Sequence, residues 1–451
     1  MKKNITLAAV LTAAALVVAA VGTLLCAGLL GRIDNPGTGG WDNSLMLPTN
    51  VASAVALILA VTDAAAAALL GVLITSEIKT SKALKAEKTV NKRKMRFAKL
   101  HEADLNAKKA AAAVYDDIDG LKTLCEDFRN FAAFDSGLYY DLKTVRSYIA
   151  AMSITRLTVL QGISGTGKTS LAYTFGKFIG RNSVVAPVQP SWKDRSDMIG
   201  YYNEFTDTYT ETDLLLSLYE ANYSDDVFTV ILDEMNISRV EYYFAEFLSL
   251  LELPASDSRR IRVTSDSREN DPELLKNGTL KLPENVWFAG TANNDDSTLA
   301  ISDKVYDRAF VIEMDKRSLP FNAPETKKKR ISAERLESLF TAARAGTKVS
   351  DETKNKLAAL DEYLISVFQI TFGNRIMRQT ENFIPVYIAC GGTETEALDI
   401  MIRGKIMRKL EALNPVYVRA HAEGLVEEIN RLFGRGALVS TLEYINKYRN
   451  G

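Results

Sequence analysis

A glycine-rich stretch in the first half of the chain has the residue types that bind phosphate groups. It reads Gly162-Ile163-Ser164-Gly165-Thr166-Gly167-Lys168-Thr169-Ser170, and its spacing fits G-x-x-x-x-G-K-[ST]. Glycines let backbone N–H groups wrap around phosphates without a clash from Cβ atoms. In that chemistry Lys168 contacts the β and γ phosphates, and the Thr169 hydroxyl is a ligand of Mg²⁺. We therefore expect a nucleoside triphosphate and Mg²⁺ to bind at residues 162–170, the alternative being a purely structural turn.

Two adjacent acidic residues further along the chain have the types needed for hydrolysis. Asp233 and Glu234 follow the apolar run 228–232, which is typical of a buried strand. We expect Asp233 to hold Mg²⁺ through water and Glu234 to polarise the attacking water. The pair therefore predicts turnover as well as binding, and its structural alternative is an acidic strand end at a turn.

Two further polar residues, Asn293 and Arg308, are candidates for contacts with the γ-phosphate. Asn293 comes after the run 286–290 and is expected to contact the γ-phosphate and the attacking water beside the acid pair. Arg308 lies just before the run 310–314, where an exposed arginine can reach the γ-phosphate of a neighbouring subunit, as an arginine finger does. A surface salt bridge, with Asp307 alongside, is the equally open alternative for Arg308.

The elements that position these residues follow from the apolar pattern. Five short apolar runs, at 156–160, 184–188, 228–232, 286–290 and 310–314, are separated by stretches with helical spacing. This pattern predicts an α/β fold, with a parallel five-stranded sheet covered by helices on both faces. The glycine stretch then lies between the first strand and the helix that begins near Ser170, which is the context the phosphate-binding pattern requires.

The N-terminal 78 residues differ from the rest of the chain in composition. The run 5–31 carries no charge, and the run 51–76 is interrupted only by Asp63. Each is long enough to cross a hydrocarbon core of about 30 Å, so residues 1–78 predict a transmembrane hairpin. Lys2 and Lys3 precede the first run and nine Lys or Arg residues lie within 79–99, which predicts an inner (cytoplasmic) membrane protein with both termini and the catalytic domain in the cytoplasm. A cleaved signal peptide is the alternative for the first run.

The charge and cysteine counts limit the function further. Residues 79–118 lack Gly and Pro, which predicts a long polar helix within a basic helical linker over 79–130. This helix either contacts anionic lipid or is simply solvated. Residues 100–451 hold 43 basic and 51 acidic residues, so a general nucleic-acid surface is not implied. Three cysteines without paired spacing and two histidines argue against a disulfide framework and a His-rich metal site.

Three blocks of the sequence together resemble the AAA+ ATPases. They read GISGTGKTS, LDEMNISRVEYYFAEFLSLLE and PENVWFAGTANNDDSTLAISDKVYDRAF, and within the family they are similar to the branch of the McrB-like restriction NTPases and the dynein- and MoxR-related proteins. The resemblance covers about 140–450. It implies a nucleotide-binding core at 131–318, a charged linker at 319–334 and a helical lid at 335–451.

The same resemblance implies an assembly and further site residues. It implies a ring of identical subunits, usually six, with nucleotide between them and Arg308 as the finger acting in trans. Arg375, in Phe372-Gly373-Asn374-Arg375, looks like the lid arginine that contacts the γ-phosphate of its own subunit, with Arg378 as a second choice. Asn236 and Arg239 match polar positions near the subunit interface, or are a helix cap and a surface charge.

Two segments of the core are candidates for contacts with a substrate. Trp192, Tyr201 and Tyr202 follow the second strand, where this family carries pore or substrate loops, and they either grip a polymer or pack on the sheet. Residues 254–282 predict an insertion or a hairpin between core elements.

The function expected from these features is nucleotide-driven remodelling of a protein partner at the cytoplasmic membrane face. ATP is the expected nucleotide and GTP stays open. The alternative is a McrB-like motor of a nucleic-acid defence system, whose nuclease is on another chain, so that nucleic acid is contacted only through a partner.

Overall fold

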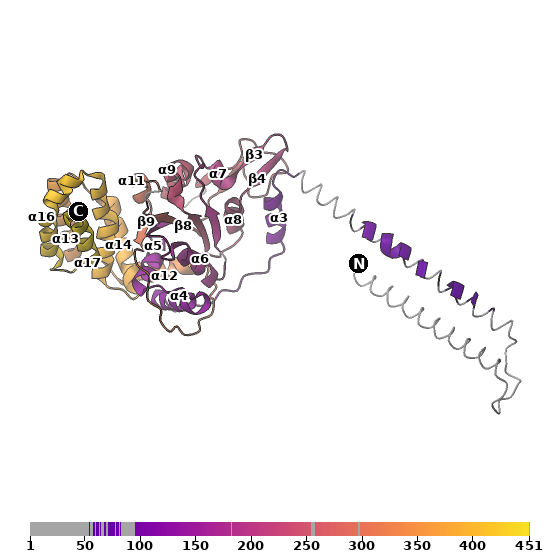
Figure 1. The fold of residues 1–451 in the computed structure, drawn as a ribbon, viewed down its shortest axis with the longest axis horizontal. Coiled ribbons are helices and arrows are strands. Elements are labelled where there is room, and N and C mark those ends of the chain that lie inside the picture. The colour runs from indigo at the N-terminus through magenta and orange to yellow at the C-terminus, as the bar shows by residue number, and fades with distance from the viewer. Residues whose placement is uncertain are drawn as a thin grey trace, which may run out of the picture. The chain divides into compact units, whose positions relative to one another are not determined.

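The structure of the chain is a computed structural model (Figure 1). It describes residues 95–450, apart from 182, 254–257, 296 and 297, together with scattered positions between 54 and 82. The chain divides into two compact units, Met1–Lys94 and Met95–Gly451. The first expected span, 5–31, lies outside the described residues, and the second, 51–76, is described only in part. Among the described residues, no helix has both the length and the apolar character needed to cross a membrane.

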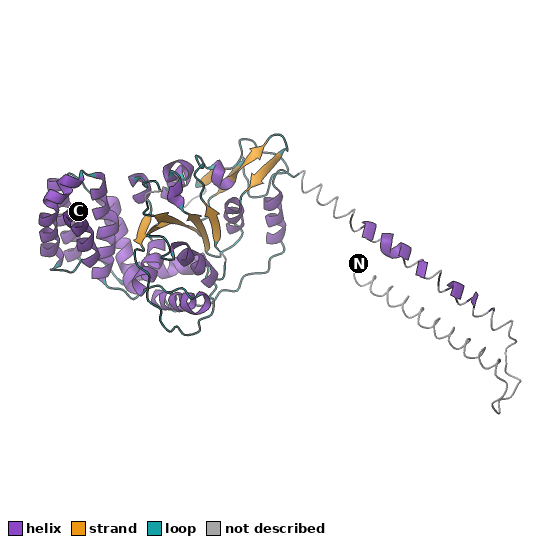
Figure 2. Ribbon diagram, viewed as in Figure 1, coloured by secondary structure: helices purple, strands orange, loops and turns teal. Residues whose placement is uncertain are grey.

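The centre of the second unit is a five-stranded parallel sheet in the order β2-β5-β8-β1-β9 (Figure 2). The strands are β1 (Leu157–Gly162), β2 (Val184–Pro187), β5 (Phe228–Asp233), β8 (Val286–Asn293) and β9 (Phe310–Glu313). All four neighbouring pairs are parallel, which confirms the α/β class and the sheet expected from the five apolar runs. Strand β8 extends beyond its apolar run because residues up to Asn293 continue to pair with β1, whose Gly162 lies opposite Asn293.

Helices cover both faces of this sheet. Side chains alternate between the faces along each strand, so Leu160 and Ile231 join one buried cluster while Val159 and Val230 join the other. The first cluster contains side chains of α4 (Leu121–Ser136), α5 (Leu142–Met152) and α6 (Lys168–Phe178). The second contains side chains of α8 (Asp213–Ala221), α9 (Val240–Tyr243) and α10 (Ala245–Glu252). Burial on both faces explains why the strands are almost continuously apolar.

Helices also make up the C-terminal part of the chain, whose last elements are yellow in Figure 1. They are α12 (Ala333–Gly346), α13 (Asp351–Phe368), α14 (Gly373–Ala389), α15 (Glu394–Met401), the π-helix η3 (Ile402–Ile406), the 3₁₀ helix η4 (Met407–Ala412), α16 (Pro415–Phe433) and α17 (Val439–Asn450). Their buried residues continue the cluster that contains α4, α5 and α6. One junction is the stacked pair Phe310 and Phe383, whose ring centroids lie 4.9 Å apart.

Two small antiparallel sheets lie outside the central one. The first pairs β3 (Gly200–Asn203) with β4 (Thr208–Glu211), between α7 (Ser196–Ile199) and α8. The second pairs β6 (Arg260–Arg262) with β7 (Thr279–Lys281), within the segment expected to be an insertion or hairpin.

The linker before α4 is helical only in part. Helix α3 covers Ala98–Ala107, so the expected continuous helix over 79–118 does not extend over residues 109–118. Asp116 explains the change, because its N–H donates to the Arg330 carbonyl at 2.8 Å and its carboxylate accepts from the Arg330 N–H at 2.7 Å. These bonds hold the segment extended against the charged linker, which local helix propensity does not reveal.

Candidate functional site

The candidate site lies at the carboxyl ends of β1, β5 and β8. From β1 the chain passes through α6 to β2 at one edge of the sheet, whereas from β8 it passes across β1 to β9 at the other edge. The connections that leave the neighbouring strands β1 and β8 therefore run toward opposite sides of the sheet. Open α/β sheets bind ligands in the crevice that forms at such a reversal.

The loop between β1 and α6 has a backbone that depends on its glycines. Gly162, Gly165 and Gly167 have φ angles of 149°, 78° and 88°, a region that other residues rarely adopt. A Cβ on Gly162 would also lie 2.5 Å from the carbonyl oxygen of Met314. The loop leads directly into the N-terminus of α6, an 11-residue helix, where unpaired N–H groups and the helix dipole favour an anion.

Lys168 is the first residue of α6 and its side chain folds back over this loop. Its Nζ donates to the carbonyl oxygens of Gly162 at 3.0 Å and Ile163 at 2.7 Å, and only 7% of the residue is exposed. Burial lowers the pKa of Lys168, while the carboxylates of Asp295 and Asp233 act in the opposite direction. Among the described residues, the ammonium group is therefore a buried cation that donates to two loop carbonyls and is available to a stronger acceptor.

Asp233 joins three elements at the end of β5. Its Oδ1 accepts from the hydroxyl of Thr169, in α6, at 2.6 Å and from the hydroxyl of Thr291, in β8, at 2.8 Å. A threonine hydroxyl and a carboxylate are hard oxygen donors of the kind that Mg²⁺ prefers. The described residues contain no group of three or more His, Cys, Asp or Glu that could hold a metal. Thr169 and Asp233 therefore fit the kind of Mg²⁺ site in which phosphate oxygens and water complete the coordination shell.

Glu234 lies where the chain leaves β5 and turns sharply into η2 (Met235–Ile237). Its φ of 53° is left-handed, which a side chain adopts at a cost of order 1–3 kcal/mol. The Glu234 N–H donates to the Thr291 hydroxyl at 2.8 Å, so one threonine holds both acidic residues in place. The turn leaves the Glu234 side chain exposed, next to Asp233.

Asn293 ends β8 beside this turn. Asn236 binds its backbone on both sides, donating from Nδ2 to the Asn293 carbonyl at 2.9 Å and accepting the Asn293 N–H at 3.3 Å. Asn236 therefore positions the end of β8, a role that its sequence position next to the acid pair did not specify. The carboxyl ends of β1, β5 and β8 thus bring together five of the predicted site residues: Lys168, Thr169, Asp233, Glu234 and Asn293.

Arg308 and Arg375 do not join this group. Both bind the carboxylate of Glu252, at the end of α10, with Nη2 to oxygen distances of 3.0 Å for Arg308 and 2.6 Å for Arg375. The Arg308 carbonyl accepts from the hydroxyl of Thr155, just before β1, at 2.8 Å. The two arginines therefore lie toward the amino ends of the strands, opposite the glycine loop, and the Arg308 Nε is buried without a partner among the described residues.

The backbone that carries Arg308 is held by a buried lysine of the C-terminal helices. Lys405, in η3, donates from Nζ to the carbonyl oxygens of Tyr306 at 2.8 Å and of Ala309. Tyr306 ends α11 (Asp303–Tyr306), so the lysine spans the turn between α11 and β9. Burial lowers the pKa of Lys405 to about 7.

The three candidate aromatic residues have different surroundings. Trp192 packs edge-on against Tyr243 at 5.3 Å, and Tyr202 lies under the guanidinium of Arg96 at 5.0 Å. Only Tyr201 is largely exposed, at 56%. Packing therefore accounts for two of the three.

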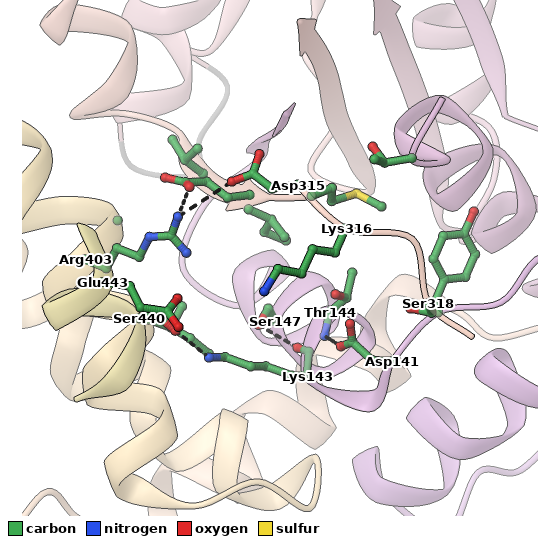
Figure 3. Close-up of a pocket in the computed structure, with 18 of the residues that line it drawn as sticks. Asp141, Lys143, Thr144, Ser147, Asp315, Lys316, Ser318, Arg403, Ser440 and Glu443 are labelled. Atoms are coloured by element: carbon green, nitrogen blue, oxygen red, sulfur yellow. Dashed lines mark hydrogen bonds and ion pairs between the residues drawn. The ribbon is translucent and has the colours of Figure 1, made fainter. Parts of the chain in front are cut away.

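A cavity of about 520 Å³ adjoins the glycine loop (Figure 3). It is lined by α5, by the end of β9 and by the helices α15, η3 and α17, and Thr166 of the loop contributes to its wall. Figure 3 shows Lys316 extending into it and Arg403 turning toward Asp315 on one side. Arg403 also forms an ion pair with the carboxylate of Glu313. The cavity is large enough for a small organic group attached to whatever the loop binds.

Sequence reasoning missed two residues beside the loop. Tyr140 donates from its hydroxyl to the Gly167 carbonyl at 3.1 Å, and burial raises its pKa well above the ordinary value. Arg408, in η4, donates to Gln161 in β1 and to Glu313 in β9, both at 3.1 Å. Neither carried a signal, because Tyr140 lies in the loop between α4 and α5 and Arg408 lies in η4, and local spacing does not show how these segments lie against the sheet.

Neither the comparison with protein-family models nor the comparison with curated proteins finds a match to this chain. A functional proposal therefore depends on the residues of the site themselves.

Proposed function

We propose that this chain is a P-loop NTPase of the AAA+ class that binds a nucleoside triphosphate with Mg²⁺ and hydrolyses it. ATP is the nucleotide we propose, with GTP as the alternative. The observation that carries the proposal is the convergence of Lys168, Thr169 and Asp233 beside a loop whose three glycines have φ angles suited to glycine. The resemblance of three sequence blocks to AAA+ ATPases also supports it.

In this proposal, nucleotide binding replaces hydrogen bonds within the chain by hydrogen bonds to the phosphates. The N–H groups of the loop and of the α6 N-terminus donate to the phosphate oxygens. Lys168 leaves the Gly162 and Ile163 carbonyls, which now hold it, and donates to phosphate oxygens, which are stronger acceptors. The cavity beside Thr166 takes the nucleoside.

The hydrolytic step in this proposal depends on how the turn after β5 is held. Thr169 and Asp233 would hold Mg²⁺, which neutralises phosphate charge. Glu234 accepts a proton from the attacking water as general base, and Asn293 orients that water from the end of β8. Thr291 holds both acidic residues, so the base and the metal ligand keep a fixed spacing.

The assembly is part of the same proposal. Arg308 lies opposite the loop of its own subunit, so we propose that it reaches the γ-phosphate of a neighbouring copy in a ring. The family resemblance implies six subunits in that ring. Arg375 shares Glu252 with Arg308, so we propose that a movement of the C-terminal helices during the cycle brings it to the nucleotide of its own subunit.

We also propose that the chain is anchored in the cytoplasmic membrane through residues 1–78 and remodels a protein partner there. The uncharged run 5–31 and the basic segment 79–99 support the anchor. The McrB-like resemblance supports the alternative of a motor for a nuclease on another chain. Hydrolysis that duplex DNA stimulates would favour that alternative, and hydrolysis indifferent to DNA would favour remodelling.

The variant Glu234→Gln tests the hydrolytic role. It keeps the shape of the side chain and removes the base, so nucleotide should bind and the chain should assemble while turnover falls by 10²–10⁴-fold. The matched control is Glu241→Gln, in the neighbouring helix α9, which should hydrolyse at the wild-type rate. Wild-type turnover in the Glu234 variant would remove that residue from the role of base.

A further inference from the structure

The segment that follows β9 lies directly against the glycine loop. The Met314 N–H donates to the Gln161 carbonyl at 2.7 Å, which extends the β9–β1 pairing beyond the end of the strand. The Met314 carbonyl oxygen is the atom that a Cβ on Gly162 would meet at 2.5 Å. The chain therefore continues along the loop as it leaves the sheet.

Arg317 brings a guanidinium group onto this loop. Its Nε donates to the Gly165 carbonyl at 2.9 Å, and a Cβ on Gly165 would lie 2.8 Å from its Nη2. The guanidinium is therefore in contact with the middle of the loop, whereas Lys168 binds the carbonyls at the start of the loop. Two cations thus hold the two halves of one short loop.

The charge of Arg317 is not matched by an acidic side chain. Within the described part of the chain, no carboxylate lies within ion-pair distance of it, although Arg308, Arg375 and Arg403 each have a glutamate partner. One of its five N–H groups is used, on a neutral carbonyl, and the residue is exposed. An arginine held in this way exchanges a weak acceptor for a phosphate at little cost, and its planar fork fits phosphate oxygens.

We propose that Arg317 is a second phosphate-binding cation of this site, which binds the polyphosphate of the nucleotide from the segment after β9. The proposal rests on the proposed function, because it assigns a further residue to the same nucleotide site. Lys168 then contacts the phosphates from α6 and Arg317 contacts them from the outer side of the loop. Each cation gives up loop carbonyls when the phosphates bind.

The test compares the full chain with Arg317→Ala and Arg317→Lys by titration calorimetry with Mg²⁺ and ATPγS, and separately with inorganic tripolyphosphate. We expect Arg317→Ala to weaken binding of both probes by about tenfold, and Arg317→Lys to recover part of the loss because it keeps the charge without the fork. The matched control is Lys327→Ala, an exposed cation further along the same segment, which should bind both probes as the wild type does.

Two results with the Arg317→Ala variant would overturn the proposal. Unchanged affinity in Arg317→Ala would show that the guanidinium takes no part in binding. Tighter binding would show that Arg317 covers the empty loop and competes with the nucleotide. A wild-type chain that binds neither probe would overturn the proposed function itself, and the assignment of Arg317 with it. Thermal melting without ligand checks that each variant is folded.

Discussion

Replacing Lys168 with methionine isolates the contribution of one charge to the site. Lys168→Met keeps the length of the side chain and removes the ammonium group, which in the structure is 7% exposed and bound to two loop carbonyls. The free energy of unfolding should change by less than about 2 kcal/mol. The reason is that losing two hydrogen bonds of about 1.5 kcal/mol each is offset by no longer burying a charge.

The effect on nucleotide binding should be larger. A charge-assisted hydrogen bond contributes about 1.5–3 kcal/mol, which corresponds to roughly 10–150-fold in the dissociation constant. Titration calorimetry of the full chain with Mg²⁺ and a non-hydrolysable triphosphate measures this factor. The matched control is Lys177→Met, at the other end of α6, whose Nζ pairs with Asp135 at 2.5 Å away from the loop. Equal affinity in the wild type and the Lys168 variant, with both folded, would refute the role given to this residue.

Three further changes have defined outcomes. Thr291→Val removes the hydroxyl that donates to Asp233, so urea unfolding should show a loss of about 1–3 kcal/mol and steady-state assays a lower turnover. Gly162→Ala places a Cβ 2.5 Å from the Met314 carbonyl oxygen at a φ of 149°, so the melting temperature should fall, by an amount equivalent to about 1–3 kcal/mol. Burial lowers the pKa of Lys405 to about 7, whereas in the unfolded chain it is about 10.4. Between about pH 7 and about pH 10.4, Lys405 is therefore protonated in the unfolded state and largely neutral in the folded state. The free energy of unfolding should rise with pH in this range, by up to about 1.4 kcal/mol per pH unit. Urea melts of Lys405→Met at pH 7 and pH 9.5 should lack this rise, and a rise equal to the wild type's would assign it to other groups.

The sheet and the loop could be predicted because their signals are local. Five apolar runs identify five strands, since a strand buried on both faces has no polar side. The positions of Lys168, Thr169 and Asp233 follow once the parallel order places the carboxyl ends of β1 and β5 on the same side of the sheet. What local pattern did not show is Thr291 as the common partner of both acidic residues, because a buried threonine in a strand is ordinary in any sheet.

The arginines show where sequence reasoning ends. Arg308 and Arg375 meet on Glu252, and this contact joins α10, the turn before β9 and α14, three parts of the chain that are far apart in sequence. Nothing in the spacing of Arg375 places it opposite the glycine loop. The contact of Arg317 with the loop was not predicted for a related reason, since it depends on how the chain leaves β9 rather than on a motif.

Hydrogen exchange at the glycine loop tests the central claim most directly. The full chain would be compared with and without Mg²⁺ and ATPγS or GTPγS, following the backbone amides of residues 162–170. Binding of phosphates by these amides predicts slower exchange there with at least one nucleotide, and less slowing in Lys168→Met at a nucleotide concentration near the wild-type dissociation constant. Exchange at these amides that neither nucleotide changes, at concentrations up to several millimolar, would contradict the claim that this loop binds a nucleoside triphosphate.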